Sequence, residues 1–255
     1  MTRLLIALLL AAVLAVGLPG ARDVPGAASA GRPVLLVVTE TAGFRHGDAI
    51  AAGLAELRRL GTRGDEGFEV RELARFAELT PEALAGARGL VLLQTSGTPD
   101  LDSAGRARLL AAVRGGLPLL AFHAAADTFH GWTAFHRMLG AEFRDHPNVG
   151  VGRVRVEDRG HPASRRLPRS FRLREEYYRF RRVPNPRRGA HVLASLDVAS
   201  FGGRPRGDRP LVWWRSERRG RVLYSALGHR PETWRDPRHR RLVAGALGWA
   251  LAPRR

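Results

Sequence analysis

The chain has 255 residues, no cysteine and a formal net charge of +18 at pH 7. The lack of cysteine excludes disulfide bonds and thiol nucleophiles. All 42 positions that carry Lys or Arg are arginine, and they are scattered among acids, prolines and glycines. No predicted helix presents a basic stripe interleaved with aromatic side chains, so the composition argues against a nucleic-acid partner.

Residues 1–30 have the pattern of a secretory signal peptide. An arginine precedes an apolar run over residues 4–18, and an Ala-Ser-Ala tripeptide ends at Ala30. The run of about 15 residues is shorter than the ~20 that a membrane-spanning helix needs. The sequence therefore favours cleavage near Ala30 over a permanent membrane anchor. We expect a secreted or extracytoplasmic protein with residues 31–255 as its one mature domain.

The mature chain alternates strand patterns with helix patterns over its first half. The predicted strands are 33–39, 68–70, 90–93 and 117–122. The predicted helices are 48–60, a segment after an N-cap at Thr80, 102–113 and 132–139. The later part has short strands at 151–156, 191–196, 211–215 and 222–227, then a helix at 238–251. Repeated strand–helix alternation predicts an α/β fold whose parallel sheet is covered on both faces.

Polar side chains follow three of the predicted parallel strands. His46 follows the first strand, Gln94 the third and His123 the fourth. The carboxyl ends of parallel strands meet at one edge, where open sheets bind ligands. His229 follows the last strand after Gly228, and it reaches the same edge if that strand is parallel to the others. The pattern predicts a histidine-rich site.

The remaining histidines have weaker claims to a functional role. His136, His191 and His239 are best interpreted as scaffold residues, because a single histidine is usually exposed or hydrogen-bonded locally. His146 and His161 each precede a proline, which leaves a turn residue and a ligand-binding residue as equal alternatives.

Short motifs in order along the mature chain resemble those of the trehalose-utilisation (ThuA-like) family. They are FRH ending at His46, GGLPLLAFHAAAD ending at Asp127, GAEF before the HP at His146, the HP at His161, EEYY ending at Tyr178, and GRVLYSALGH ending at His229. One departure is the glutamate at Glu175, where the family usually has aspartate. The matches cover nearly the whole mature chain.

This resemblance implies a flavodoxin-like three-layer sandwich with a mostly parallel central sheet, like that of class I glutamine amidotransferases. In that wider group the turn after the fourth strand carries a nucleophilic cysteine, and His123 occupies this place here. Glutaminase chemistry is excluded because the chain has no cysteine. The resemblance also implies a substrate class, namely trehalose and related disaccharides or their keto-sugar derivatives.

Two chemical routes fit these residues. In the first, His123 or His46 acts as a base on the sugar, and Glu176 or Asp127 orients it or acts as the acid. In the second, His46, His123 and His229 bind a divalent metal together with a carboxylate. No compact ligand motif such as HExxH is present, so the metal is kept as the alternative and no cofactor is identified.

Sugar contacts are expected from Gln94, Trp132, His146 and Tyr178. A non-catalytic carbohydrate-binding module is the alternative from a different class. Three histidines and two carboxylates at one edge favour an enzyme, because ionisable groups gather at working sites. The sequence leaves the oligomeric state open, with a homodimer among the options.

Overall fold

The structure is a computed structural model that describes residues 32–63, 67–186, 189–202 and 209–253. The signal peptide expected over residues 1–30, with its cleavage near Ala30, lies outside the described residues. The chain from Arg32 onward forms one compact unit. Among the described residues, no helix combines the length and apolar character needed to cross a membrane.

The helices and strands largely follow the predicted segments. The helices are α1 (Gly47–Gly61), α2 (Pro81–Ala85), α3 (Ser103–Gly115), α4 (Thr133–Leu139), α5 (Pro231–Arg235) and α6 (Pro237–Leu251), with 3-10 helices η1 (Phe76–Glu78), η2 (His123–Asp127) and η4 (Val198–Phe201). The strands are β1 (Val34–Val38), β2 (Glu69–Leu73), β3 (Ala87–Leu93), β4 (Leu119–Phe122), β5 (Glu142–Asp145), β6 (Gly150–Val156), β7 (Ser170–Glu175), β8 (Arg179–Arg182), β9 (Ala190–Asp197), β10 (Arg209–Glu217) and β11 (Gly220–Ser225). Thr80 caps α2 through its side-chain oxygen, as predicted, and the side chain of Asp102 caps α3.

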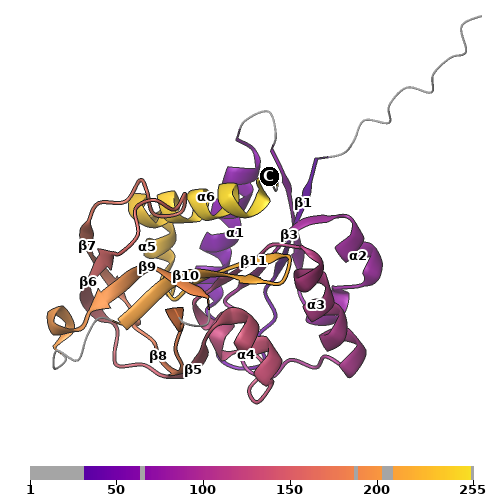
Figure 1. Ribbon diagram of the computed structural model, residues 1–255, viewed down its shortest axis with the longest axis horizontal. Helices are drawn as coiled ribbons and strands as arrows, with labels where there is room; N and C mark the ends of the chain where they lie inside the picture. The colour runs from indigo at the N-terminus through magenta and orange to yellow at the C-terminus, as the bar shows by residue number, and fades with distance from the viewer. Residues whose placement is uncertain (1–31, 64–66, 187–188, 203–208, 254–255) are drawn as a thin grey trace, which may run out of the picture. The chain divides into compact units, whose positions relative to one another are not determined.

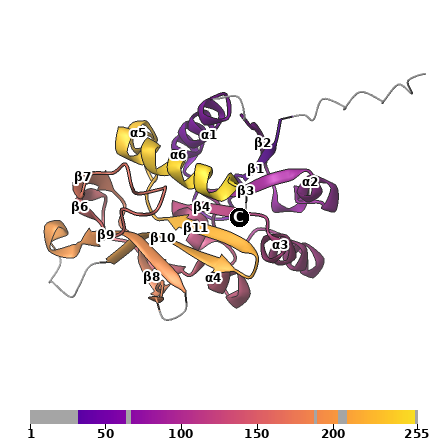
Figure 2. The ribbon, with the colours of Figure 1, turned by 45° about the horizontal axis from the view of Figure 1, so that its top comes forward.

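Within the described chain, the central sheet has nine strands in the order β2-β1-β3-β4-β11-β10-β9-β6-β7. The first five of these pair in parallel, and the others pair antiparallel. Figure 2 shows the antiparallel strands continuing the sheet away from β4 and β11. The predicted α/β class is confirmed, with an antiparallel extension made by strands that need no crossover helix.

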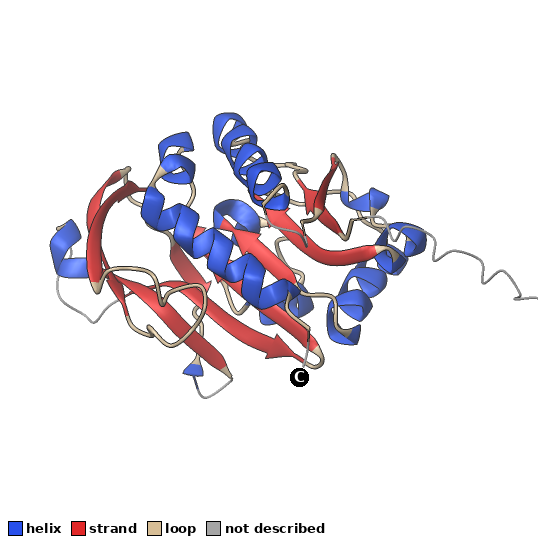
Figure 3. Cartoon of the chain, turned by 90° about the horizontal axis from the view of Figure 1, so that it is seen from above, coloured by secondary structure: helices blue, strands red, loops and turns tan. Residues whose placement is uncertain are grey.

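Helices cover both faces of the parallel half. Figure 1 shows α1, α5 and α6 on one side of the sheet and α3 and α4 on the other, and Figure 3 shows helices lying across the strands. The strands between these layers are buried on both faces, which is why β1 and β4 read as continuous apolar runs. The parallel pairing of β11 with β4 directs the chain after β11 to the same edge as His46 and His123.

The sequence patterns missed β7. Its residues alternate, with Phe171, Leu173 and Glu175 buried and the arginines between them exposed. An edge strand with one covered face shows this alternation rather than an apolar run. Three antiparallel steps separate β7 from β10, so β7 runs in the same direction as β11, and its carboxyl end points to the same edge.

The stability of the fold should depend on pH through His239 of α6. This side chain is buried against Trp234 and Phe122, and neither ring nitrogen has a hydrogen-bond partner among the described residues. Burial lowers the pKa of His239 from 6.5 to about 4, although Asp236 opposes the shift. As the pH falls, His239 is therefore protonated in the unfolded chain before it is protonated in the folded chain. The free energy of unfolding falls by up to about 3 kcal/mol between pH 6.5 and pH 4.

Replacing His239 with leucine should remove this contribution. Between pH 7 and pH 5 this histidine should cost wild type about 2 kcal/mol of unfolding free energy, and His239→Leu should not show that loss. Urea titration at the two pH values measures the difference. The exposed His191→Gln serves as the matched control and should keep the wild-type pH dependence. An unchanged pH dependence in His239→Leu would contradict the assignment.

Candidate functional site

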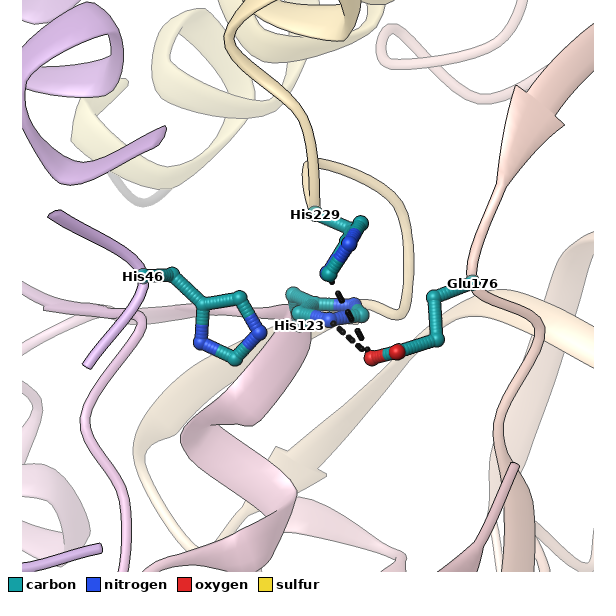
Figure 4. Close-up of side chains that lie close together, drawn as sticks. All are labelled: His46, His123, Glu176 and His229. Atoms are coloured by element: carbon teal, nitrogen blue, oxygen red, sulfur yellow. Dashed lines mark hydrogen bonds and ion pairs between the residues drawn. The ribbon is translucent and has the colours of Figure 1, made fainter. Parts of the chain in front are cut away.

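Four side chains in the described part of the chain gather at the carboxyl edge of the sheet: His46, His123, Glu176 and His229 (Figure 4). His46 follows β1 and occupies the N-cap position of α1. His123 comes directly after β4, His229 follows β11, and Glu176 follows β7. The geometry of the sheet thus places residues from four distant parts of the sequence together.

The four side chains lie within contact distance of one another. His123 Nε2 is 3.2 Å from Glu176 Oε2, and His229 Nδ1 is 3.4 Å from the same oxygen. The ring centre of His46 lies 5.0 Å from those of both His123 and His229. His229 is the most exposed of the four, with 20% of its side chain accessible, so solvent reaches the group from its side.

A backbone carbonyl fixes the orientation of His123. Its Nδ1 lies 2.8 Å from Ala226 O. A carbonyl oxygen only accepts, so Nδ1 carries the hydrogen, and Nε2 of the neutral ring presents a lone pair toward Glu176. Two acceptors 3.2 Å apart repel each other unless a cation lies between them. A proton or a metal ion meets that need.

The pKa values of His46, His229 and Glu176 are all shifted downward. Burial, and then the charges of His123 and His229, lower the pKa of His46 to about 3. Burial and the charge of His123 lower the pKa of His229 to about 4. Burial raises the pKa of Glu176, but its contacts with the histidines outweigh this and hold the pKa below its usual value.

The turns that carry these residues are strained. His123 has φ 47° and Gln94 has φ 58°, in the left-handed region that costs a non-glycine residue about 1–2 kcal/mol. Contacts hold both turns: Tyr224 Oη donates to His123 O at 2.7 Å, and Gln94 Nε2 donates to Gly228 O. The predicted sugar contact Gln94 is fully buried and supports the loop of His229.

Glu175 is a supporting residue that the sequence analysis did not assign. It is fully buried, and burial raises its pKa. Its two carboxylate oxygens accept the backbone N–H groups of Gly228 at 3.0 Å and His229 at 3.2 Å. The carboxylate therefore fixes the loop that carries His229. The EEYY motif indicated two acids, but not that the first faces the backbone and the second faces the histidines.

The structure brings two further predicted residues next to the group. His146 Nδ1 lies 3.0 Å from Glu176 Oε1, at the exposed side. The ring of Tyr178 covers one face of His123, with ring centres 4.2 Å apart. Phe44, which was not assigned from the sequence, is 72% exposed and places its ring 4.8 Å from that of His46.

Two other predicted residues have their main contacts elsewhere. Asp127 pairs with His130 Nε2 at 2.9 Å. The ring of Trp132 stacks on Phe135 with ring centres 5.5 Å apart. The structure does not bring Asp127 or Trp132 into the group of four.

A family model and solved structures show which known proteins this chain is similar to. Residues 34–250 match the family model described as ThuA, trehalose utilisation. The chain belongs to the ThuA family. This confirms the resemblance drawn from the motifs, and the description of the ThuA family indicates a carbohydrate-related role. A search of curated proteins finds no match.

Solved structures agree with the family assignment. A putative ThuA-like protein from Bacteroides uniformis ATCC 8492 is 26% identical, with a TM-score of 0.72 over 92% of this chain and 95% of that one. A putative ThuA-like protein from Parabacteroides merdae ATCC 43184 is 16% identical, with a TM-score of 0.68 over 86% and 90% of the two chains. A β-galactosidase from Bacillus circulans sp. alkalophilus is 9% identical, with a TM-score of 0.57 over 86% of this chain and 31% of that one. The latter two likenesses, both at low identity, show the fold alone.

Proposed function

We propose that this ThuA-family protein is an exported enzyme that acts on a disaccharide or its keto-sugar derivative by proton transfer. The observation that carries the proposal is the His123–Glu176 pair, in which Ala226 O fixes the ring and Nε2 faces the carboxylate at 3.2 Å. Such a pair takes a proton from a sugar hydroxyl, or from a C–H group beside a ketone, and returns it. The family description supports the carbohydrate class.

Hydrolysis by two opposed carboxylates is less well supported. That chemistry needs two acids facing each other across the scissile bond at about 5–9 Å. Glu175 is the acid adjacent to Glu176 in sequence, but its oxygens are occupied by backbone N–H groups of the His229 loop. Proton transfer by the single carboxylate and its histidines therefore fits the residues better.

Direct assay with sugars tests the proposal. The purified protein would be incubated with trehalose, other disaccharides and their 3-keto derivatives, and the products followed by NMR. We expect turnover of at least one of them, and its loss in His123→Asn, which tolerates the left-handed backbone at this position. His130→Gln is the matched control. Sugar binding without any turnover would overturn the enzyme in favour of a carbohydrate-binding module.

Phe44 should contribute to substrate affinity. Its exposed ring beside His46 offers an apolar face to a sugar. Truncation in Phe44→Ala should raise KM by about ten- to a hundredfold, because burying a phenylalanine side chain is worth roughly 1.5–3 kcal/mol, while kcat changes little. Val183→Ala, which removes another exposed apolar side chain, is the control. A fall in kcat at constant KM would contradict a binding role.

Export is the part of the proposal that rests on the sequence alone. The mature protein is expected to begin near Gly31. N-terminal sequencing of the protein recovered outside the cytoplasm checks this. An exported chain that retains residues 1–30 intact would contradict cleavage.

A further inference from the structure

We infer that His46, His123, His229 and Glu176 bind one divalent transition-metal ion, with Zn²⁺ as the best fit. The inference rests on the proposed function, since it concerns the same site; a metal bound there would take the lone pair of His123 Nε2, so that the metal rather than this pair would activate the sugar. One potential ligand atom from each residue lies within 4.8 Å of the others. Figure 4 shows the four side chains, from separate segments, directed at a common point.

The donor atoms select the class of metal. Three imidazoles and one carboxylate are typical ligands of zinc and its first-row neighbours, whereas Mg²⁺ and Ca²⁺ prefer oxygen ligands. Each imidazole binds a metal through a ring-nitrogen lone pair of its neutral form.

The spacing is close to that of a filled site. Ligands about 2.1 Å from a tetrahedral metal lie ~3.4 Å apart. The two contacts of Glu176 Oε2, at 3.2 Å to His123 and 3.4 Å to His229, already have this separation. The widest pair of ligand atoms must close by up to ~1.4 Å to reach the tetrahedral spacing, which small side-chain rotations supply.

The charge balance around Glu176 also calls for a cation. The chain has 42 arginines, yet within the described residues the ion-pair partners of this carboxylate are all histidines: His123, His146 and His229. Nδ1 of His46 is buried and has no hydrogen-bond partner in the described part of the chain. A largely buried anion beside unsatisfied imidazole lone pairs is stabilised by a metal ion.

Supporting contacts orient the ligands as metal sites require. His123 donates its Nδ1–H to Ala226 O, which leaves Nε2 free to bind. Glu175 holds the backbone of His229. A metal bound here would polarise a sugar carbonyl, or lower the pKa of a bound water, that joined the four residues as a fifth ligand.

Metal titration of the tag-free protein tests the inference. After treatment with chelator and dialysis, Zn²⁺, Co²⁺ and Mg²⁺ would be titrated by calorimetry, and Co²⁺ binding also followed by its visible absorption. We expect one Zn²⁺ per chain and affinity for Mg²⁺ at least about 100-fold weaker. His46→Ala and His229→Gln should each weaken Zn²⁺ binding by at least about tenfold, and the exposed His191→Gln should not.

The outcomes separate this inference from the proposed function. The lack of a stoichiometric Zn²⁺ site in folded wild-type protein, or equal affinity for Mg²⁺, would overturn the metal site. Full sugar turnover by such a metal-free protein would leave the proposed enzyme intact. Tight Zn²⁺ binding by a protein that turns over no sugar would support the metal site and overturn the enzyme. Circular dichroism confirms that each variant is folded before its affinity is compared.

Discussion

Glu176→Gln should lower kcat/KM for the sugar reaction by about 10²- to 10⁴-fold, the range of a lost proton-transfer group. The amide has nearly the same shape but carries no charge. It therefore neither takes up nor releases a proton beside His123 Nε2, 3.2 Å away, nor balances a cation among the histidines. Steady-state kinetics on the sugar identified by NMR measures the loss, and calorimetry with Zn²⁺ gives a second reading that needs no substrate.

A matched control separates this effect from a general change of charge. Glu157→Gln alters an exposed acid after β6 and should leave both kcat/KM and Zn²⁺ affinity unchanged. If Glu176→Gln lowered kcat/KM by less than about threefold and kept wild-type Zn²⁺ affinity, Glu176 would have no role in the site. The loss of even one general acid–base group lowers the rate by more than that.

Glu175→Ala should destabilise the fold by about 2–5 kcal/mol and also disturb the site. The truncation leaves a cavity and deprives the N–H groups of Gly228 and His229 of their buried acceptor. For a domain of this size the loss corresponds to a fall in Tm of roughly 5–20 °C, which thermal unfolding followed by circular dichroism detects.

The conservative variant tests whether Glu175 acts through position. Glu175→Gln retains one carbonyl acceptor, so its Tm should lie between those of Glu175→Ala and wild type. Its Zn²⁺ affinity should also be intermediate, because that affinity depends on the placement of His229. Glu157→Ala is the surface control. A Tm for Glu175→Ala within about 1 °C of wild type would show that the loop is held by other contacts.

The parallel half of the fold was readable from the sequence because its strands are buried on both faces. Continuous apolar runs revealed β1, β3 and β4, and the residues just after them include His46 and His123. Because parallel strands end at one edge of a sheet, these histidines were predicted to lie together. His229 was predicted to join them if β11 is parallel, and β11 does pair in parallel with β4.

The pairing of the antiparallel half was harder to predict, because it depends on long-range contacts and because β6 and β7 alternate buried with exposed residues. The exposed arginines of β7 concealed this strand, so no predicted strand end preceded Glu176. Local spacing also could not reveal that Asp127 turns toward His130, three residues away along the chain. The roles assigned to individual side chains stay predictions for the variants above.

The residues of the site come from both halves of one sheet: His46 and His123 follow parallel strands, and Glu176 follows the edge strand β7. The group exists only when both halves have folded together, so a ligand that binds it binds the native chain and not the unfolded one. At 100 times its Kd such a ligand raises the free energy of unfolding by about 2.7 kcal/mol. Melting curves recorded across a panel of metal ions and sugars would therefore identify what the site binds before any reaction is known.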